Sequence, residues 1–218
     1  MLPCRGCLGP LGHGAEAGLC ARCWSGLQAL PEGRCPCCAL PHGEGSCPEP
    51  TAWTLGDALW DYHGGRPPLG ALLLPAIKQG ELGWRRALLG RAAGATMPGW
   101  AAEVDAVTSA PSALPRRLLR GFDLAADLGK QVAARLGRPY AALLAKRWLS
   151  GRQASRTESE RRRLPRRAIA LGRGASPSGI LLLVDDVWTT GTTLLRCAEA
   201  LIEGGAAEVR VLTLFRAM

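Results

Sequence analysis

The chain has 218 residues, enough for one α/β domain with a small appendage. It is 47% hydrophobic and 21% charged, as in ordinary globular proteins. The sequence contains no run of eighteen apolar residues, so we expect no membrane span. The net charge of +9 is unevenly spread: residues 112–173 hold sixteen Lys and Arg against four Asp and Glu. This local +12 favours polyanionic partners, namely a pyrophosphate, a nucleotide or a nucleic-acid backbone, although a solvated Arg-rich face is the alternative.

The first segment of the chain is rich in cysteine, with eight of the nine cysteines in residues 1–47. The start of the chain shows no hydrophobic secretory signal, so we expect a cytoplasmic protein with reduced thiols. The first four cysteines have the spacing C-x2-C-x12-C-x2-C, which predicts a tetrahedral zinc site. Disulfides or a thioredoxin-like redox pair are the alternatives, but the presence of two matched C-x2-C pairs, or knuckles, favours zinc. The predicted ligands are Cys4, Cys7, Cys20 and Cys23.

A second zinc site is suggested by three further cysteines, Cys35, Cys38 and Cys47. A fourth ligand would be one of three nearby side chains, His42, Glu44 or Cys37. Alternatively, Cys37 and Cys47 are bystanders and only one metal binds. We expect residues 1–50 to form a small zinc-ribbon domain, because Pro48-Glu49-Pro50 is a natural boundary.

Residues 51–218 alternate predicted strands and helices. We expect a strand or hairpin in 51–66, helices in 68–78 and 82–95, a strand in 104–108, a helix in 122–136, a strand in 180–184, a helix to residue 202 and a strand in 209–215. Residues 146–167 are basic and without periodicity, which predicts a mobile loop. The alternation predicts an α/β domain with a parallel sheet and helices on both faces.

The segment 180–193 indicates what the chain binds. Its aliphatic start predicts a buried strand, and Asp185 and Asp186 follow at the carboxyl end, where open α/β sheets bind ligands. The next loop offers N–H groups and hydroxyls at a helix N-terminus, which suits a phosphate. Its residues are Thr189, Thr190, Gly191, Thr192 and Thr193. Paired acids beside a phosphate loop fit a phosphorylated sugar, with carboxylates accepting hydrogen bonds from the ribose hydroxyls.

This segment resembles the phosphoribosyl pyrophosphate motif of type I phosphoribosyltransferases. A Walker A loop is excluded because no Gly-Lys-Ser/Thr follows, and a dinucleotide fingerprint because the three-glycine spacing is absent. A strand-to-helix turn capped by Thr hydroxyls is the structural alternative. The resemblance implies a parallel-sheet type I phosphoribosyltransferase-like domain over residues 51–218. Transfer of the sugar would need positioning, Mg²⁺ and charge neutralisation more than a nucleophile, with Asp185 and Asp186 as the candidate catalytic groups.

A pyrophosphate needs a second anion-binding group opposite the first. The turn Ser109-Ala110-Pro111-Ser112 is the best candidate, since it follows a predicted strand. Three cations come shortly after it, Arg116, Arg117 and Arg120. A surface loop with solvated arginines is the alternative. Trp188, between the acids and the loop, either packs or stacks on a base.

The whole chain resembles the ComF competence family, which joins a zinc-ribbon head to a phosphoribosyltransferase-like body. Besides the knuckles and the segment 180–193, the likeness rests on short matches along the body: Ile77-Lys78, Ser109-Ala110-Pro111, Arg120-Gly121-Phe122, Gln153, Arg161 and Gly204-Gly205-Ala206. It departs from the family pattern at Ser109, Asp123, Leu124 and Leu164, and at Glu44, where a cysteine of the second group is usual.

The family resemblance implies a cytoplasmic bacterial protein that supports natural transformation. Its members act on incoming single-stranded DNA beside a helicase-like partner. Two other functions stay open from the residues themselves. One is an active phosphoribosyltransferase acting on a base or small molecule, and the other is an interaction scaffold in which the zinc head docks a partner protein.

Overall fold

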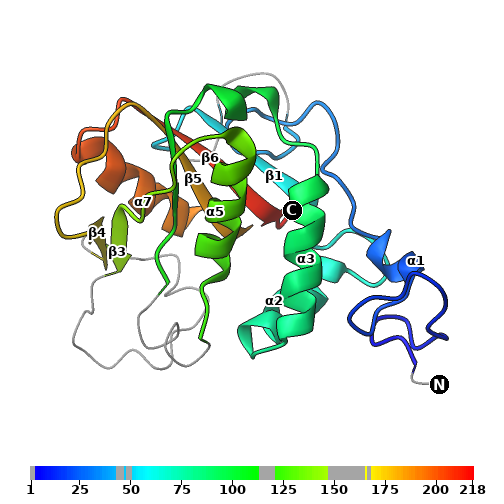
Figure 1. Cartoon of the computed structure of the whole chain (residues 1–218). Helices are drawn as coiled ribbons and strands as arrows, with labels where there is room; N and C mark the ends of the chain where they lie inside the picture. Colours follow the sequence, from blue (N-terminus) through cyan, green and yellow to red (C-terminus); the bar gives the residue numbers. More distant parts are fainter. Residues whose placement is uncertain (1–2, 43–46, 48–50, 113–120, 147–164, 166–167) are drawn as a thin grey trace.

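The computed structural model describes residues 3–42, 47, 51–112, 121–146, 165 and 168–218 (Figure 1). Along the chain the elements are α1 (Ala21–Trp24), β1 (Leu55–Asp61), α2 (Leu69–Lys78), α3 (Leu82–Gly94), the 3-10 helix η1 (Gly99–Glu103), β2 (Ala106–Ser109), α5 (Leu124–Leu136), β3 (Leu144–Lys146), β4 (Ile169–Leu171), β5 (Ile180–Trp188), α7 (Thr192–Glu203) and β6 (Glu208–Arg216). The two helices predicted in 68–78 and 82–95 are thereby confirmed as α2 and α3.

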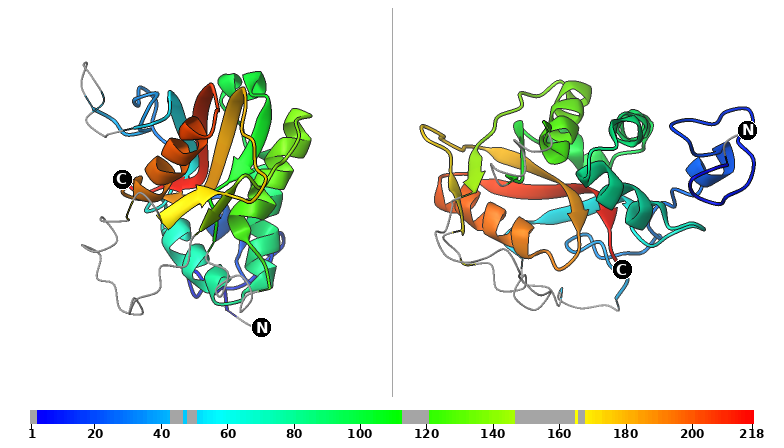
Figure 2. Two further views of the ribbon diagram at one scale, coloured as in Figure 1. Left: turned by 90° about the vertical axis from the view of Figure 1, so that its left-hand side faces the viewer. Right: turned by 90° about the horizontal axis from the view of Figure 1, so that it is seen from below.

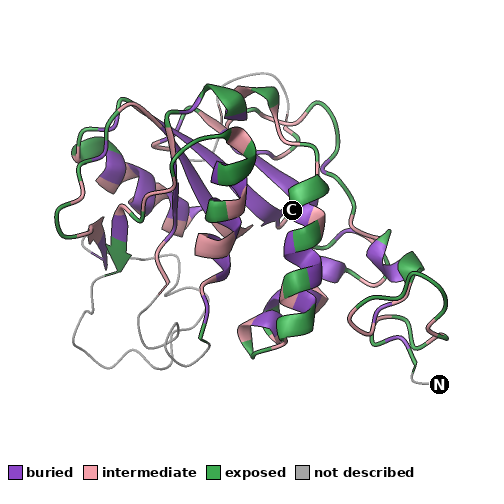
Figure 3. Cartoon of the chain, viewed as in Figure 1, coloured by how far each residue is buried: buried purple, intermediate pink, exposed green. Residues whose placement is uncertain are grey.

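A four-stranded sheet forms the centre, with strand order β1-β6-β5-β2 and every neighbouring pair parallel. Figure 2 shows α7 on one face of this sheet and α3 and α5 on the other. Alternate residues of β5 serve the two faces: Leu181 and Leu183 pack with α7, whereas Leu182 and Val184 pack with α3 and α5. The buried residues therefore line both sides of the sheet (Figure 3), and the predicted α/β fold with a parallel sheet is confirmed.

The predicted strand 180–184 is longer in the structure, because β5 continues through both acids to Trp188. Its last residues still pair with β6, with Asp185 opposite Thr213 and Trp188 opposite Arg216. The two acids thus lie within the last residues of the strand rather than after its end. Because neighbouring residues of a strand point to opposite faces, Asp185 and Asp186 are directed to opposite sides of the sheet.

The helix predicted in 122–136 is confirmed as α5, and its two ends have clear causes. Asp123 accepts a hydrogen bond from the Ala126 N–H at the first turn. Gly137 ends the helix with φ +65°, a conformation that glycine adopts without strain. The hairpin of β3 and β4, which pair antiparallel, was not predicted, because three-residue strands carry too little periodicity.

The cysteine-rich segment packs on both faces of the sheet. Cys4 and Cys23 are buried with Trp24, Leu69 and Trp84, on the side of α2 and α3. Cys38, in contrast, is buried with Trp53 and Trp188 on the side of α7. In Figure 2 the dark-blue start of the chain accordingly lies beside α3, and the lighter-blue segment that follows passes to the opposite side of the sheet.

Candidate functional site

The two acids at the end of β5 have different surroundings. Asp186 Oδ2 lies 2.8 Å from Nζ of Lys78, the last residue of α2, and both side chains are partly exposed. Asp185 faces the other side, where it lines a cavity together with the loop that precedes α7. One carboxylate of the pair is thus neutralised by a lysine, whereas the other faces the loop.

The Asp185 carboxyl has an unusual pKa. Burial raises it first, the negative charge of Asp186 raises it further, and the pKa reaches about 7. The Asp186 N–H, which donates to Asp185 Oδ1 at 2.8 Å, and the charge of Lys78 oppose this rise. A carboxyl group that titrates near neutral pH is able to hold or release a proton as a ligand binds.

The loop between β5 and α7 forms the other wall of that cavity. Thr192 begins α7, and its N-cap residue Gly191 has no side chain, so the first-turn N–H groups have no side-chain cap. The hydroxyls of Thr190 and Thr192 lie 3.0 Å apart and share a hydrogen bond. The cavity has a volume of about 30 Å³. Uncapped N–H groups at the positive end of a helix attract an anion.

Gly191 is required by its surroundings as well as by its conformation. Its φ is +68°, and a Cβ at this position would lie 2.9 Å from Trp188 Nε1. Trp188 itself is fully buried, so of the two alternatives for this residue packing is confirmed and stacking on a base is wrong. Its Nε1 is nevertheless a buried donor without a hydrogen-bond partner among the described residues.

The turn after β2, predicted on the pyrophosphate side, lies next to the acids because Ser109 pairs with Val184. Ser109 Oγ shares a hydrogen bond of 2.8 Å with Tyr140 Oη, and the Ala110 N–H donates to Val184 O. These two groups are therefore used within the fold, which leaves the turn at Pro111 and Ser112 to approach a ligand. Arg116, Arg117 and Arg120 lie outside the described residues.

The first four cysteines come together as the spacing predicts. Their sulfurs lie within 4.8 Å of one another, with Cys4 and Cys23 at 3.6 Å and Cys7 and Cys20 at 3.8 Å. Tetrahedral Zn–S bonds of ~2.3 Å place sulfurs about 3.8 Å apart, whereas a disulfide needs ~2.0 Å. Burial opposes ionisation of Cys4, but N–H donors from Cys20, Cys7 and Gly6 lower its pKa to about 6. The group could hold a metal ion.

The second group consists of Cys35, Cys38, His42 and Cys47, whose ligand atoms also lie within 4.8 Å of one another. Of the three candidates for a fourth ligand, the structure brings His42 into the group. Cys37 is not part of the group, and its sulfur lies 3.2 Å from Thr51 Oγ1, while Glu44 lies outside the described residues. This group too could hold a metal ion, with three sulfurs and one nitrogen.

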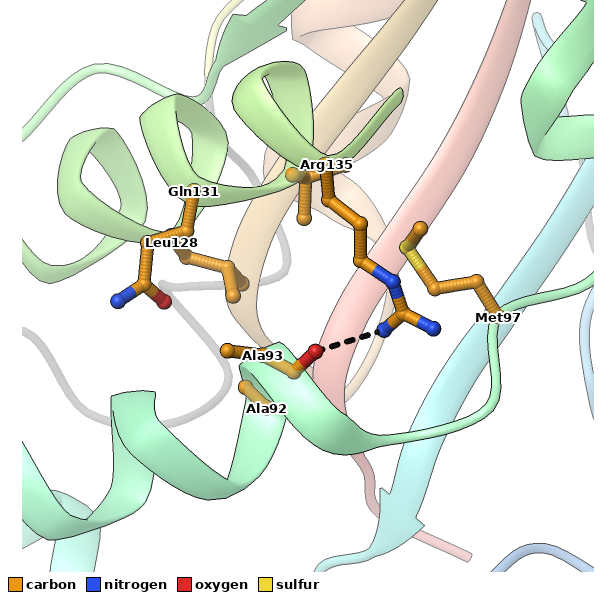
Figure 4. A pocket seen from close by; sticks show the side chains of 7 residues that line it. Ala92, Ala93, Met97, Leu128, Gln131 and Arg135 are labelled. Atoms are coloured by element: carbon orange, nitrogen blue, oxygen red, sulfur yellow. Dashed lines mark hydrogen bonds between the residues drawn. The ribbon is translucent and has the colours of Figure 1, made fainter. Parts of the chain in front are cut away.

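A second cavity lies between α3 and α5, where Figure 4 shows Arg135 reaching the Ala93 carbonyl oxygen at 3.0 Å. Its volume is about 10 Å³, which is room for no more than about one water molecule. It is lined mostly by apolar side chains, among them Met97 and Leu128. A cavity with this apolar lining does not suit a sugar phosphate.

Comparison with known proteins agrees with this arrangement. The family of phosphoribosyl transferase domains matches residues 124–218, from the start of α5 to the end of the chain. Residues 124–218 thus resemble a phosphoribosyl transferase domain, and the parallel sheet has a phosphoribosyltransferase-like fold. No curated protein matches the chain in sequence.

Several solved structures are similar to parts of the chain. The glutamine phosphoribosylpyrophosphate amidotransferase from B. subtilis is 26% identical, with 60% of this chain and 26% of that chain covered and a TM-score of 0.40. This chain thus spans about a quarter of the amidotransferase. Orotate phosphoribosyltransferase from Aeropyrum pernix is 20% identical, with 61% and 58% covered and a TM-score of 0.33. Adenine phosphoribosyltransferase from Thermoanaerobacter pseudethanolicus is 16% identical, with 70% and 86% covered and a TM-score of 0.33.

The ion pair between Lys78 and Asp186 is not predicted by any pattern in the sequence, where Lys78 is only part of the family resemblance. The two residues are far apart in the chain, so only the packing of α2 on the sheet brings them together. Separately, none of the described helices has the length and apolar character needed to cross a membrane.

Proposed function

We propose that this chain binds phosphoribosyl pyrophosphate, or a related phosphorylated sugar, at the carboxyl end of β5. The observation that carries the proposal is the shared cavity: Asp185 and the residues from Thr189 to Leu194 line the same space. A sugar phosphate needs an anion site and a hydrogen-bond acceptor for its hydroxyls a short distance apart. The helix N-terminus provides the first, and the carboxylate provides the second.

Each residue has a distinct part in this proposal. The N–H groups and hydroxyls of Thr190, Thr192 and Thr193 hold the phosphate, and Asp185 accepts from the ribose hydroxyls. Lys78 supplies a positive charge beside Asp186. Carboxylate oxygens suit Mg²⁺, which Asp185 would hold beside the loop and which would neutralise charge on the pyrophosphate.

Isothermal titration with phosphoribosyl pyrophosphate and Mg²⁺ tests the proposal. Replacing both acids, Asp185→Asn with Asp186→Asn, should weaken binding at least about tenfold, since hydrogen bonds to charged groups contribute roughly 1.5–3 kcal/mol each. Glu203→Gln controls for loss of a negative charge, because it removes one acid at the far, exposed end of α7. Unchanged affinity in the double variant would refute the proposed site. Release of pyrophosphate in the presence of bases would extend binding to transferase activity.

We also propose that each cysteine group binds one zinc ion. Two sets of four soft or borderline ligands, each within 4.8 Å, support this. Zinc content by mass spectrometry under native conditions should therefore be two ions per chain. A single ion would assign zinc to one group only, and the variants described below identify which.

For the biological role we propose a ComF-like function in the uptake or processing of single-stranded DNA, beside a helicase-like partner. The resemblance along the sequence and the local charge of +12 in residues 112–173 support it. Single-strand affinity should fall steeply with salt, and replacing Arg161, Arg162 and Arg163 by Gln should reduce the slope by about 2, at roughly 0.7 per phosphate contact. A shallow slope in the unmodified protein would contradict backbone contacts.

A further inference from the structure

One buried side chain joins the second cysteine group to the loop of residues 189–193, called here the phosphate loop. Arg216, at the end of β6, is only 1% exposed. Its Nε donates to Cys38 O at 3.0 Å, and its Nη1 donates to Trp188 O at 3.0 Å and to Thr189 O at 2.5 Å. A single guanidinium therefore bonds a carbonyl of the cysteine group and two carbonyls where the loop begins. Its Cζ also lies over the Trp188 ring, 4.6 Å from the centroid.

A second line of contacts joins the same two regions through β1. Trp53 Nε1 donates to Cys37 O at 2.7 Å, and the Trp53 and Trp188 rings meet edge to face at 5.3 Å. Gly56 donates its N–H to Pro36 O at 2.8 Å. A Cβ on Gly56 would lie 2.6 Å from Cys37 O and 2.9 Å from the Trp188 ring. The turn from Cys35 to Cys38 thus packs closely around Gly56 and Trp53, which in turn contact Trp188, the last residue before the loop.

The first cysteine group has a different neighbourhood, although it too begins with a C-x2-C pair. Trp84 of α3 donates from Nε1 to Ala17 O at 2.6 Å, and Trp24 donates to Glu16 O at 2.9 Å. Its buried sulfurs pack with α2 and α3, on the face of the sheet opposite α7. This group therefore provides an internal control for any effect that depends on contact with the loop.

We propose that a metal ion in the second cysteine group holds the phosphate loop in its binding conformation through Arg216, so that the affinity for the sugar phosphate depends on metal occupancy at this group alone. A metal fixes the turn from Cys35 to Cys38 and with it the Cys38 carbonyl oxygen. Without the metal that acceptor moves, and a buried guanidinium that loses an acceptor rearranges its other hydrogen bonds, among them those to Trp188 O, Thr189 O and Ala217 O. The sugar phosphate is the ligand of the proposed function, on which this inference rests.

Matched cysteine substitutions test this coupling. Cys47→Ser and Cys7→Ser each remove one thiolate from a four-ligand group, and each should lower the zinc content by one ion. Cys47→Ser should weaken binding of phosphoribosyl pyrophosphate with Mg²⁺ about tenfold, within the usual range of coupling between sites. It should also speed amide hydrogen exchange in residues 189–193. Cys7→Ser should leave both the affinity and the exchange of these residues as in the unmodified protein.

Arg216→Lys tests whether Arg216 carries the coupling, and this test remains available if Cys47→Ser fails to fold. A lysine keeps the charge but cannot reach both regions with separate nitrogens. This variant should retain both zinc ions yet show the weakened binding and the faster exchange. Wild-type exchange in both Cys47→Ser and Arg216→Lys would overturn the inference while leaving the proposed function intact. Failure of the unmodified protein to bind the sugar phosphate would refute the proposed function, and the exchange rates would still decide the coupling.

Discussion

The two cysteine groups each begin with a C-x2-C pair, and they lie on opposite faces of the sheet. Cys4 and Cys23 are buried on the side of α2 and α3, whereas Cys38 is buried on the side of α7. The two acids divide in the same way, because Asp186 pairs with Lys78 of α2 and Asp185 lines the cavity before α7. Each cysteine group therefore shares a face of the sheet with one of the acids. The comparison teaches that a repeated motif takes its role from the surface that it packs against.

The largest expected effect is the loss of stability when the first cysteine group loses its metal. Cys4 is fully buried in the first group, so Cys4→Ser should remove its metal and lower the free energy of unfolding by about 4 kcal/mol or more. Chemical denaturation followed by far-UV circular dichroism measures this change. Cys7→Ser, at an exposed member of the group, should lower it less. Equal stability of Cys4→Ser and the unmodified protein would contradict a structural metal on this face.

Stability against pH examines the acid on the α7 face. The pKa of Asp185 is raised from 3.8 to about 7, so its folded form prefers the proton. Protonated Asp185 therefore stabilises the folded state fully below about pH 4, and this stabilisation is lost as pH rises through 7. Asp185→Asn never carries the charge, so its advantage over the unmodified protein should grow by about 2 kcal/mol between roughly pH 5.5 and pH 8. Thermal melts at several pH values measure it, with Glu203→Gln as the charge-matched control. A constant difference would refute the raised pKa.

Gly191→Ala tests the close approach of the loop to Trp188. The new Cβ would meet Trp188 Nε1 at 2.9 Å, and φ is +68°, so unfolding should become easier by about 2 kcal/mol and sugar-phosphate binding should weaken. Gly90→Ala in α3 is the control, since its Cβ meets nothing within 4 Å and alanine favours a helix by roughly 1 kcal/mol. If both variants behave alike, the loop is not held as the structure shows.

The smallest effect concerns the acid on the α2 face. Lys78→Met breaks a partly exposed ion pair, so stability should fall by about 0.5–1 kcal/mol. Loss of the positive charge should further lower the affinity for phosphoribosyl pyrophosphate by a few-fold, which calorimetry detects. Lys130→Met, at an exposed position of α5, controls for the change in net charge. An unchanged affinity would show that Lys78 does not assist the ligand.

Much of this fold could be predicted from the sequence, because its elements carry strong local signals. The aliphatic start of β5 and the leucine stripe of α5 fix their type, and the knuckle spacing brings Cys4 and Cys7 together with Cys20 and Cys23. The ion pair of Lys78 with Asp186 and the contacts of Arg216 could not be predicted. They join residues distant in the chain, and no local pattern records which helix end or strand end will meet.

The amide signals of the loop test the central claim most directly. Upon addition of ribose 5-phosphate, two-dimensional NMR of the full chain should show the largest downfield shifts at the N–H groups of residues 190–193, where the phosphate would accept hydrogen bonds. Arg216→Lys should reduce these shifts at equal ligand concentration. If the loop signals stay in place while the ligand saturates elsewhere, or if no signal moves, then a sugar phosphate does not bind before α7 and the account is contradicted.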